Sequence, residues 1–446
     1  MILITIIVFL FLFAINQKHL KNSILRNMIS IFLAFWCITL FLSNFNPFGL
    51  YDVSHRTYFL LLLFVISFCG GVFSCKSLQI QHINYMDFSL LIERIIINKY
   101  FLLIIIFLDA VLLHLYIKEQ AILSIYSVAD VRVNLDELLY EGNSFLGLIR
   151  NMFILPLIPI LSFLGTYLLM YNRKRLIPLF LILFFVVVSA LLGGSRGGIL
   201  KIAVYCVFMI TCKCIFNNKQ NKSSFFLQFL KLSPIIIIIL VVMSNMTAQR
   251  EFDMHGFSWE GIKLGSESLA KHFVVYCVGP FRALDYSLNN NYLEIVDGYK
   301  WGKCSLGFID GMLSLVLNSL GIGYQPAYRP LAKLVQENWI YVGAGESFNF
   351  AYTALLFYYI DLGVLGIIIF PFIFGRIVSA LFNKFVITCN PMILVLLSYL
   401  FTIMIDTIFT WRLYRHQAFT TFLLIVCLNF LYKKYIKFSS RKKYKI

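Results

Sequence analysis

The segment Gly-Gly-Ser-Arg-Gly-Gly at residues 193–198 has the residue types that bind anions, and it lies between two long apolar stretches. The first turn of a helix leaves backbone N–H groups unpaired, and glycine lets an anion approach them closely. Arg196 adds a full positive charge at this position. The segment therefore suits a phosphate cradle, and a tight helical hairpin with an arginine extending to the membrane interface is the structural alternative.

Further arginines follow toward the C-terminus, and several stand beside groups that can transfer protons. Arginine binds phosphate and carboxylate with two parallel hydrogen bonds and keeps its charge when partly dehydrated. Arg250 is, with Arg196, a candidate for binding an anionic group. The arginines expected to bind substrate are Arg282, Arg329, Arg412 and Arg415.

Three other side chains are candidates for acid–base or binding roles. His272 is a candidate for a proton-transfer group, and Glu346 lies at the edge of an apolar segment. Asp361 lies in apolar surroundings, where a carboxylate is costly unless it is paired. It is therefore either part of a structural turn with Gly363 or a partner of one of the arginines.

The elements that position these residues are predicted to be membrane helices. The chain is 60% hydrophobic and only 13% charged, which excludes an ordinary soluble protein. Runs of about 20 uncharged residues can each cross the roughly 30 Å of hydrocarbon in a bilayer, and we expect about eleven of them. They are residues 1–16, 28–45, 57–74, 100–117, 151–171, 176–193, 199–216, 232–248, 348–383, 388–409 and 417–432. Because 348–383 is too long for one simple span, part of it is expected to lie at the interface or to dip into the membrane.

Basic residues predict how the chain is oriented. Lysines gather in alternate connections and in the C-terminal tail, which indicates that these face the cytoplasm. The N-terminus is then outside and the C-terminus cytoplasmic. The formal net charge of +17 follows from this distribution, so no nucleic-acid partner is needed to explain it.

Two connections on the outer side are long, and most arginines but few lysines fall on that side. Residues 118–150 form one outer loop and residues 249–347 form a large one within a single transmembrane domain that covers 1–446. The large loop keeps apolar residues throughout, and residues 305–324 are apolar enough for a short re-entrant or interfacial helix. Cys277 and Cys304 both fall in this loop, where a disulfide between them is possible in principle.

Taken together, these features resemble the bacterial O-antigen and capsule repeat-unit polymerases of the Wzy type. The resemblance rests on Ser195-Arg196-Gly197 at the junction of two mid-chain spans, and on a long outer loop with a Gly-Pro turn at Gly279-Pro280. It also rests on a closing motif on re-entry to the membrane, in which Asn349, Tyr352 and Thr353 precede Tyr359-x-Asp361-x-Gly363-x-x-Gly366.

The resemblance implies an all-α polytopic membrane protein with the GT-C-like architecture of polymerases and ligases. It implies a metal-independent glycosyltransferase without a cofactor that acts in the bacterial cytoplasmic (inner) membrane on oligosaccharides linked to undecaprenyl pyrophosphate. A flippase and a regulator of polysaccharide chain length would be its partners beside the lipid bilayer. Arg196 and the Asp361–Gly363 element are the sites that the resemblance carries over. Since pyrophosphate is the leaving group that the resemblance implies, Arg196, Arg250 and Arg282 are expected to stabilise its charge, and Arg196 and Arg250 are expected to be catalytic. Glu346 and His272 are then the candidates for the catalytic base that accepts a proton from the acceptor hydroxyl.

Two other functions are compatible with part of the pattern. An O-antigen ligase would share the loop and the arginines but would use another acceptor. A lipid-linked oligosaccharide flippase is disfavoured by the single large outer loop, since a transporter needs polar groups along a central path instead.

Overall fold

A computed structural model of the chain describes residues 2–20, 24–76, 78, 98–123, 149–171, 176–191, 196–216, 237, 240–245, 247–248, 257–337, 339–348 and 352–443. The chain forms two compact units. The first comprises residues 1–81, 270–388 and 400–419, and the second comprises residues 82–269, 389–399 and 420–446. Each is described by itself below.

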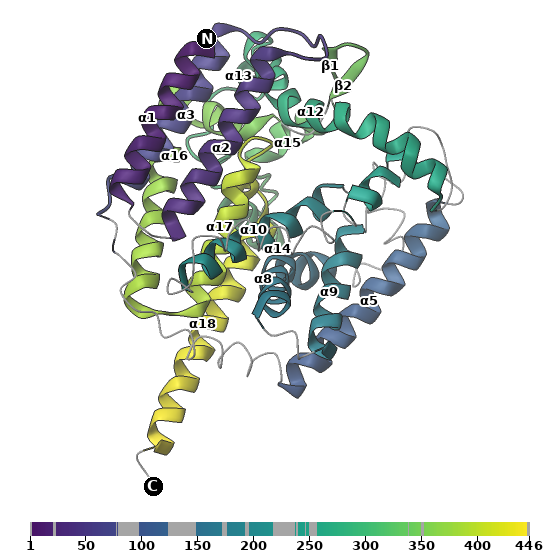
Figure 1. The fold of residues 1–446 in the computed structure, drawn as a ribbon, viewed down its shortest axis with the longest axis vertical. Helices are drawn as coiled ribbons and strands as arrows, with labels where there is room; N and C mark the ends of the chain where they lie inside the picture. The colour runs from purple at the N-terminus through teal and green to yellow at the C-terminus, as the bar shows by residue number, and fades with distance from the viewer. Residues whose placement is uncertain are drawn as a thin grey trace. The chain divides into compact units, whose positions relative to one another are not determined.

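The first unit is built on helices from the two ends of the chain. α1 (Ile2–His19), α2 (Ile24–Phe45) and α3 (His55–Phe73) come first, and α16 (Thr353–Thr388) returns beside them. Figure 1 shows the purple N-terminal helices alongside the green α16, and among the helices that the structure describes, α3 and α16 pack most extensively against each other. Aromatic rings fill the core between them, among them Phe32, Trp36, Phe64 and Tyr358.

Glycines allow α3 and α16 to approach each other closely. A Cβ atom added to Gly71 would lie 1.9 Å from the carbonyl oxygen of Phe372, and one added to Gly375 would lie 2.2 Å from that of Phe68. Small residues at facing positions are typical of helix contacts in membranes, where packing and not water exclusion drives association. The two glycines are therefore a requirement of this contact.

The helix α16 is interrupted near its beginning. Leu362 (φ −144°) and Gly363 (φ +61°) have non-helical backbone angles, so Thr353–Thr388 contains a short first part and a long second part. Gly363 adopts a left-handed conformation that favours glycine. This break accounts for the length of the predicted apolar segment 348–383, which no single straight span explains.

The segment between residues 257 and 348 is folded. It contains α12 (Trp259–Asn289), α13 (Tyr292–Ile295), α14 (Gly307–Ser319) and α15 (Tyr328–Glu337). A two-stranded antiparallel hairpin follows, of β1 (Ile340–Gly343) and β2 (Glu346–Phe348). An isolated bridge joins Gly343 to Leu50, just after α2. This part of the chain is therefore fixed to the ends of the long helices.

The second unit is also helical. It contains α5 (Lys99–Leu123), the π-helix η1 (Arg150–Ile154), α8 (Leu155–Tyr171), α9 (Leu176–Leu191) and α10 (Arg196–Phe216). Two further helices contribute residues to both units, namely α17 (Pro391–Asp406) and α18 (His416–Lys443), with the 3-10 turn η2 (Arg412–Tyr414) between them. The helices α8, α9 and α10 pack against one another.

The protein is mostly helical and has the helices of a multi-pass membrane protein. Five described helices are long and apolar enough to cross a membrane, and several shorter ones are apolar. Helices occupy the position of every predicted apolar segment except 232–248, of which only part is described. The prediction of an all-α membrane protein is confirmed at this level.

Candidate functional site

A stripe of polar side chains along the second half of α12 and the residue that follows it lines a hollow in the first unit. Arg282, Asp285, Tyr286, Asn289 and Asn290 follow one another at the spacing of a single helix face. Opposite them lie the segment before α3, with Tyr51 and Asp52, and strand β1, with Ile340, Tyr341 and Val342. We call this space of about 160 Å³ the α12 hollow.

Arg282 is the most buried charged group of the α12 hollow, with only 4% of its surface exposed. Its Nη1 atom donates to Ser43 Oγ (3.4 Å) and to the carbonyl of Val278 (3.3 Å), and Nη2 donates to Asn46 Oδ1 (3.2 Å). Its buried Nε has no hydrogen-bond partner. Burial lowers the pKa of Arg282 below its usual value, but a guanidinium stays charged in proteins. Nε is therefore a buried donor that has no acceptor in the described part of the chain.

Asp285 connects α12 to the beginning of α3. Its Oδ1 accepts hydrogen bonds from the hydroxyl of Ser54, from Thr57 Oγ1 (2.5 Å) and from the backbone N–H of Ser54 (3.3 Å). Ser54 is the N-cap residue of α3. A carboxylate at a helix N-terminus is favourable because it faces the positive end of the helix dipole. Asp285 thus positions the polar stripe against the first unit's long helices.

The balance of charge in the α12 hollow favours a ligand rich in hydroxyl groups over a phosphate. Asp52 and Asp285 carry two negative charges against the single positive charge of Arg282. Carboxylates, amides and a guanidinium together offer acceptors and donors for hydroxyls. The ring of Tyr51 meets that of Tyr341 edge to face at 5.5 Å, which adds flat apolar surface at the rim.

Asp361 lies at the break in α16 and is completely buried. Its carboxylate accepts backbone hydrogen bonds from Cys304 (2.9 Å) and Ser305 (2.6 Å), and its carbonyl accepts one from Trp301 (3.1 Å). Of the two roles that the sequence left open for Asp361, the turn role has direct geometric support here. The carboxylate fixes the segment before α14 to the broken helix.

Other residues of the closing motif have structural contacts as well. A Cβ atom on Gly366 would lie 2.0 Å from the carbonyl oxygen of Tyr358, so the position requires glycine. Tyr359 accepts a hydrogen bond at 3.1 Å from Arg56, near the beginning of α3. Asn349, which belongs to the same motif, lies outside the described residues.

Glu346 and His272 lie on neighbouring elements. Glu346, on β2, forms an ion pair with Lys271 of α12 at 2.6 Å, with side chains 18% and 37% exposed. His272 follows Lys271 on α12 and is half-buried. Since Tyr276 of α12 also contacts Phe348 of β2, the hairpin is attached to this helix by both polar and aromatic contacts.

The other three predicted substrate-binding arginines occupy separate positions. Arg412 Nε binds Asp406 Oδ2 at 2.7 Å, and Arg415 Nε donates to Tyr414 Oη at 2.8 Å. Arg329 is exposed near the beginning of α15. None of these three lines the α12 hollow, so among the predicted substrate-binding arginines the hollow contains only Arg282.

The side chains of Arg196 and Arg250 are not among the described residues, so neither is placed relative to the α12 hollow. Arg196 is the first residue of α10 in the second unit, as expected for an arginine at a helix start, and its side chain lies outside the described residues. Arg250 and residues 193–195 lie outside them as well. Their roles stay predictions.

Two details expected from the sequence differ in the structure. The predicted Gly-Pro turn is wrong, because Gly279 and Pro280 lie inside α12. Gly279 instead makes room for Phe348, whose ring would lie 2.8 Å from an added Cβ atom. Cys277 and Cys304 are both buried free thiols, so the disulfide considered for this pair is not formed. Burial raises the pKa of Cys277 to about 12.

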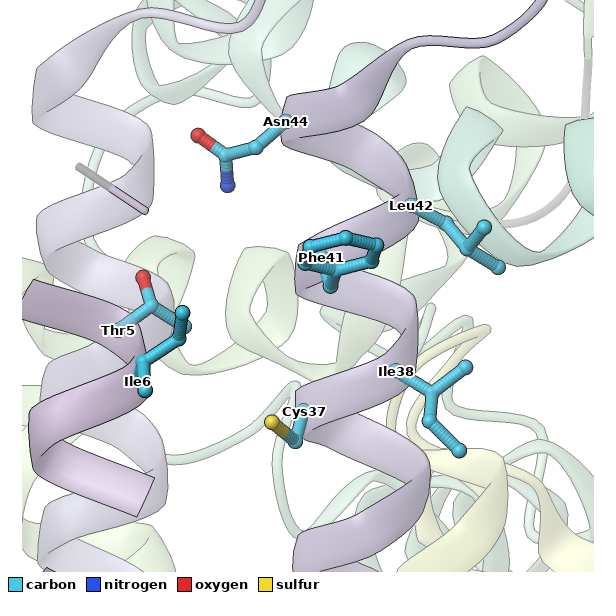
Figure 2. A pocket seen from close by; sticks show the side chains of 7 residues that line it. All are labelled: Thr5, Ile6, Cys37, Ile38, Phe41, Leu42 and Asn44. Atoms are coloured by element: carbon cyan, nitrogen blue, oxygen red, sulfur yellow. The ribbon is translucent and has the colours of Figure 1, made fainter. Parts of the chain in front are cut away.

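A second hollow of about 200 Å³ lies between α1 and α2. Figure 2 shows Thr5 and Ile6 of α1 opposite Cys37, Phe41 and Asn44 of α2. Its surface is apolar, which suits a hydrocarbon chain.

Within the described parts of the chain, no three His, Cys, Asp or Glu side chains cluster as a metal site requires.

Asp285, Asp52 and the tyrosines of the α12 hollow were not among the residues predicted from the sequence. A signal for the α12 members existed in the spacing from Arg282 to Asn290, which places five polar residues on one face of a helix. Tyr51, Asp52 and Tyr341 come from distant segments and gave no such signal.

No family model, no curated protein and no solved structure matches this chain.

Proposed function

We propose that the protein polymerises oligosaccharide repeat units that are linked to undecaprenyl pyrophosphate, at the outer face of the bacterial cytoplasmic membrane. The observation that carries the proposal is the α12 hollow. It combines carboxylates, amides, tyrosines and a buried arginine with an unpartnered Nε, beside the ends of apolar helices. Such groups bind sugar hydroxyls, and the adjacent helices suit a substrate with a lipid tail.

In this proposal the α12 hollow binds a sugar ring, not the pyrophosphate. Two carboxylates would repel a dianionic group, whereas they accept hydrogen bonds from hydroxyls. The positive charge that the pyrophosphate needs is assigned to Arg196 and Arg250. Arg282 would orient the sugar through its positive charge at the wall of the hollow.

The reaction joins one glycan to another. A hydroxyl of the terminal sugar on an incoming lipid-linked unit attacks the anomeric carbon of the growing chain. The bond between that carbon and the pyrophosphate oxygen breaks, and undecaprenyl pyrophosphate leaves with the electron pair. Glu346 or His272 accepts the hydroxyl proton.

The membrane part of the proposal rests on the sequence and on the apolar helices. We propose about eleven spans with a GT-C-like arrangement, an outer N-terminus and a cytoplasmic C-terminus. The apolar hollow between α1 and α2 offers a place for part of the isoprenoid chain, since its lining residues are mostly aliphatic or aromatic.

Deletion of the gene distinguishes the proposal from its two alternatives by the glycan that accumulates. Loss of a polymerase leaves single repeat units attached to their final acceptor, and the ladder of longer chains disappears. Loss of a ligase leaves long chains on the lipid carrier, and loss of a flippase leaves single units on the cytoplasmic side. A deletion strain that still makes long, laddered polysaccharide contradicts the proposal.

A further inference from the structure

The helix α14 (Gly307–Ser319) exposes a stripe of apolar side chains and buries two polar ones, Asp310 and Ser314. Leu306, Ile309, Leu313, Val316 and Leu320 are each between 46% and 70% exposed. Their spacing of three and four residues places them in one stripe along the helix and its flanking residues. This stripe, which we call the α14 stripe, faces away from the first unit.

The opposite face of α14 carries the polar contacts. Asp310 is buried, and its two oxygens accept hydrogen bonds at 2.6 Å from the hydroxyl of Tyr324 and from the backbone N–H of Ala327. Ser314 is buried too and donates to the carbonyl of Tyr324 at 3.0 Å. This arrangement is the reverse of a helix on the surface of a soluble domain, which turns its polar side to water.

A contiguous row of exposed aliphatic side chains marks a surface that is covered by another apolar phase. The sequence around the α14 stripe allows that phase to be hydrocarbon, because residues 311–328 contain no charged side chain. A helix of this length spans only about 20 Å, too short for the roughly 30 Å of a bilayer core. It suits a position along the interface.

The beginning of α14 is attached to a helix that is long and apolar enough to cross the membrane. Asp361 of α16 binds the backbone N–H groups of Cys304 and Ser305, immediately before α14. Just beyond the break in α16, Leu365 is 63% exposed, as lipid-facing residues of a span are. The α14 stripe therefore begins next to a surface that already faces lipid.

Residues before α14 are of the kind that anchor proteins at the level of lipid headgroups. Tyr299 and Trp301 are 46% and 75% exposed, and Lys303 is exposed beside them. Tyrosine and tryptophan are enriched at membrane interfaces, where their rings meet both hydrocarbon and water. Lysine adds attraction to anionic headgroups.

We propose that α14 is an interfacial helix whose α14 stripe inserts into the hydrocarbon of one leaflet, with Tyr299, Trp301 and Lys303 at the headgroups. The bilayer is then part of the structure of this loop: it covers the apolar face, while the protein satisfies the polar face. This inference concerns membrane contact alone and does not depend on the proposed glycosyltransferase activity.

The test is photo-crosslinking in the full-length protein, reconstituted into vesicles of phosphatidylethanolamine and phosphatidylglycerol. The photoreactive residue p-benzoylphenylalanine replaces Leu313 or Val316 of the α14 stripe. Leu365 of α16 serves as the lipid-facing reference. Ile295 of α13 is the matched control, because it is 55% exposed and apolar but lies between Glu294 and Asp297.

After illumination, mass spectrometry measures the fraction of protein that carries a phospholipid adduct. We expect the fractions at positions 313 and 316 to lie within about twofold of that at 365, and at least about fivefold above that at 295. Adduct formation at 365 without adducts at 313 and 316 overturns the inference. So does cross-linking of 313 and 316 to a second copy or to another segment of this chain in place of lipid.

Discussion

At the scale of single residues, Arg282 and Asp361 are both buried charges, but their hydrogen bonding differs. Both oxygens of Asp361 accept backbone N–H groups, so its bonding is complete within the protein. Arg282 binds only uncharged oxygens in the described part of the chain and keeps Nε without a partner. Asp361 is therefore suited to hold the structure together, whereas Arg282 is suited to bind a ligand in the α12 hollow.

Asp361→Ala is expected to destabilise the protein. It leaves the N–H groups of Cys304 and Ser305 buried without acceptors, at a cost of about 1–3 kcal/mol each. Asp361→Asn keeps one acceptor and should lie between wild type and Asp361→Ala in a thermal unfolding experiment in detergent. The control is Asp297→Asn, the same change at an exposed position, which should leave the unfolding temperature unchanged. A fully stable Asp361→Ala variant would contradict the turn role.

A pair of variants tests whether Glu346 acts as a base or only as an ion-pair partner. Glu346→Gln and Lys271→Gln both break the same 2.6 Å contact. A partly exposed pair of this kind contributes only about 0–1 kcal/mol to stability, whereas loss of a general base lowers turnover by about 10²–10⁴-fold. We expect the large loss for Glu346→Gln alone, measured as glycan formed per unit time. Equal losses in the two variants would remove Glu346 from the chemistry and leave His272.

At the scale of elements, the contact between α3 and α16 determines where the break in α16 and the beginning of α3 lie. The N-cap of α3 binds Asp285 of the α12 hollow, and the break in α16 holds the segment before α14. Both functional proposals therefore depend on this helix pair.

Gly71→Ala and Gly375→Ala are expected to weaken the pair. Each added Cβ atom would meet a backbone carbonyl of the partner helix at about 2 Å, and overpacking of this kind typically costs about 1–3 kcal/mol. The matched control is Gly323→Ala, because Gly323 has no atom within 4 Å of the added Cβ and no left-handed backbone angle. Thermal unfolding in detergent measures all three. Unfolding temperatures that do not differ among them would show that α3 and α16 are not this close.

The sequence predicts those elements that are marked by a local pattern of residues, but not the contacts between residues that lie far apart in the chain. Runs of apolar residues place the long helices to within a few residues, because the bilayer sets their length. The break at Leu362 and Gly363 was foreseen from the excess length of the apolar segment and as one of two roles for Asp361, a turn with Gly363. The helix α12 was hidden by Pro280, which usually ends a helix. The α12 hollow depends on Tyr51 and Tyr341 meeting across the fold, and no local pattern encodes such a contact.

At the scale of the whole molecule, lysines and arginines are distributed differently: most lysines fall in the predicted cytoplasmic loops, and most arginines fall on the predicted outer side. Lysines would hold the cytoplasmic loops in place, and the outer arginines would serve the substrate. The assignment of sides follows from the loops alone, so it can be tested without knowing the reaction.

Reporter fusions give that test. A fluorescent protein that folds only in the cytoplasm should be bright when fused after residue 446, and alkaline phosphatase should be active when fused after residue 290 in the large loop. The prediction follows from the excess of basic residues in the C-terminal tail. An inactive phosphatase fusion after residue 290, with a bright fluorescent protein at the same position, would reverse the orientation.

The proposed function requires that this chain itself transfers glycan between lipid-linked substrates, and a reconstituted reaction measures that transfer. Purified protein in vesicles is mixed with undecaprenyl-pyrophosphate-linked repeat units, and the glycans are then separated by size. We predict a ladder of chains that lengthen by whole repeat units while undecaprenyl pyrophosphate is released, with much slower growth for Arg196→Ala. Repeat units that remain single in the presence of folded wild-type protein would contradict the account.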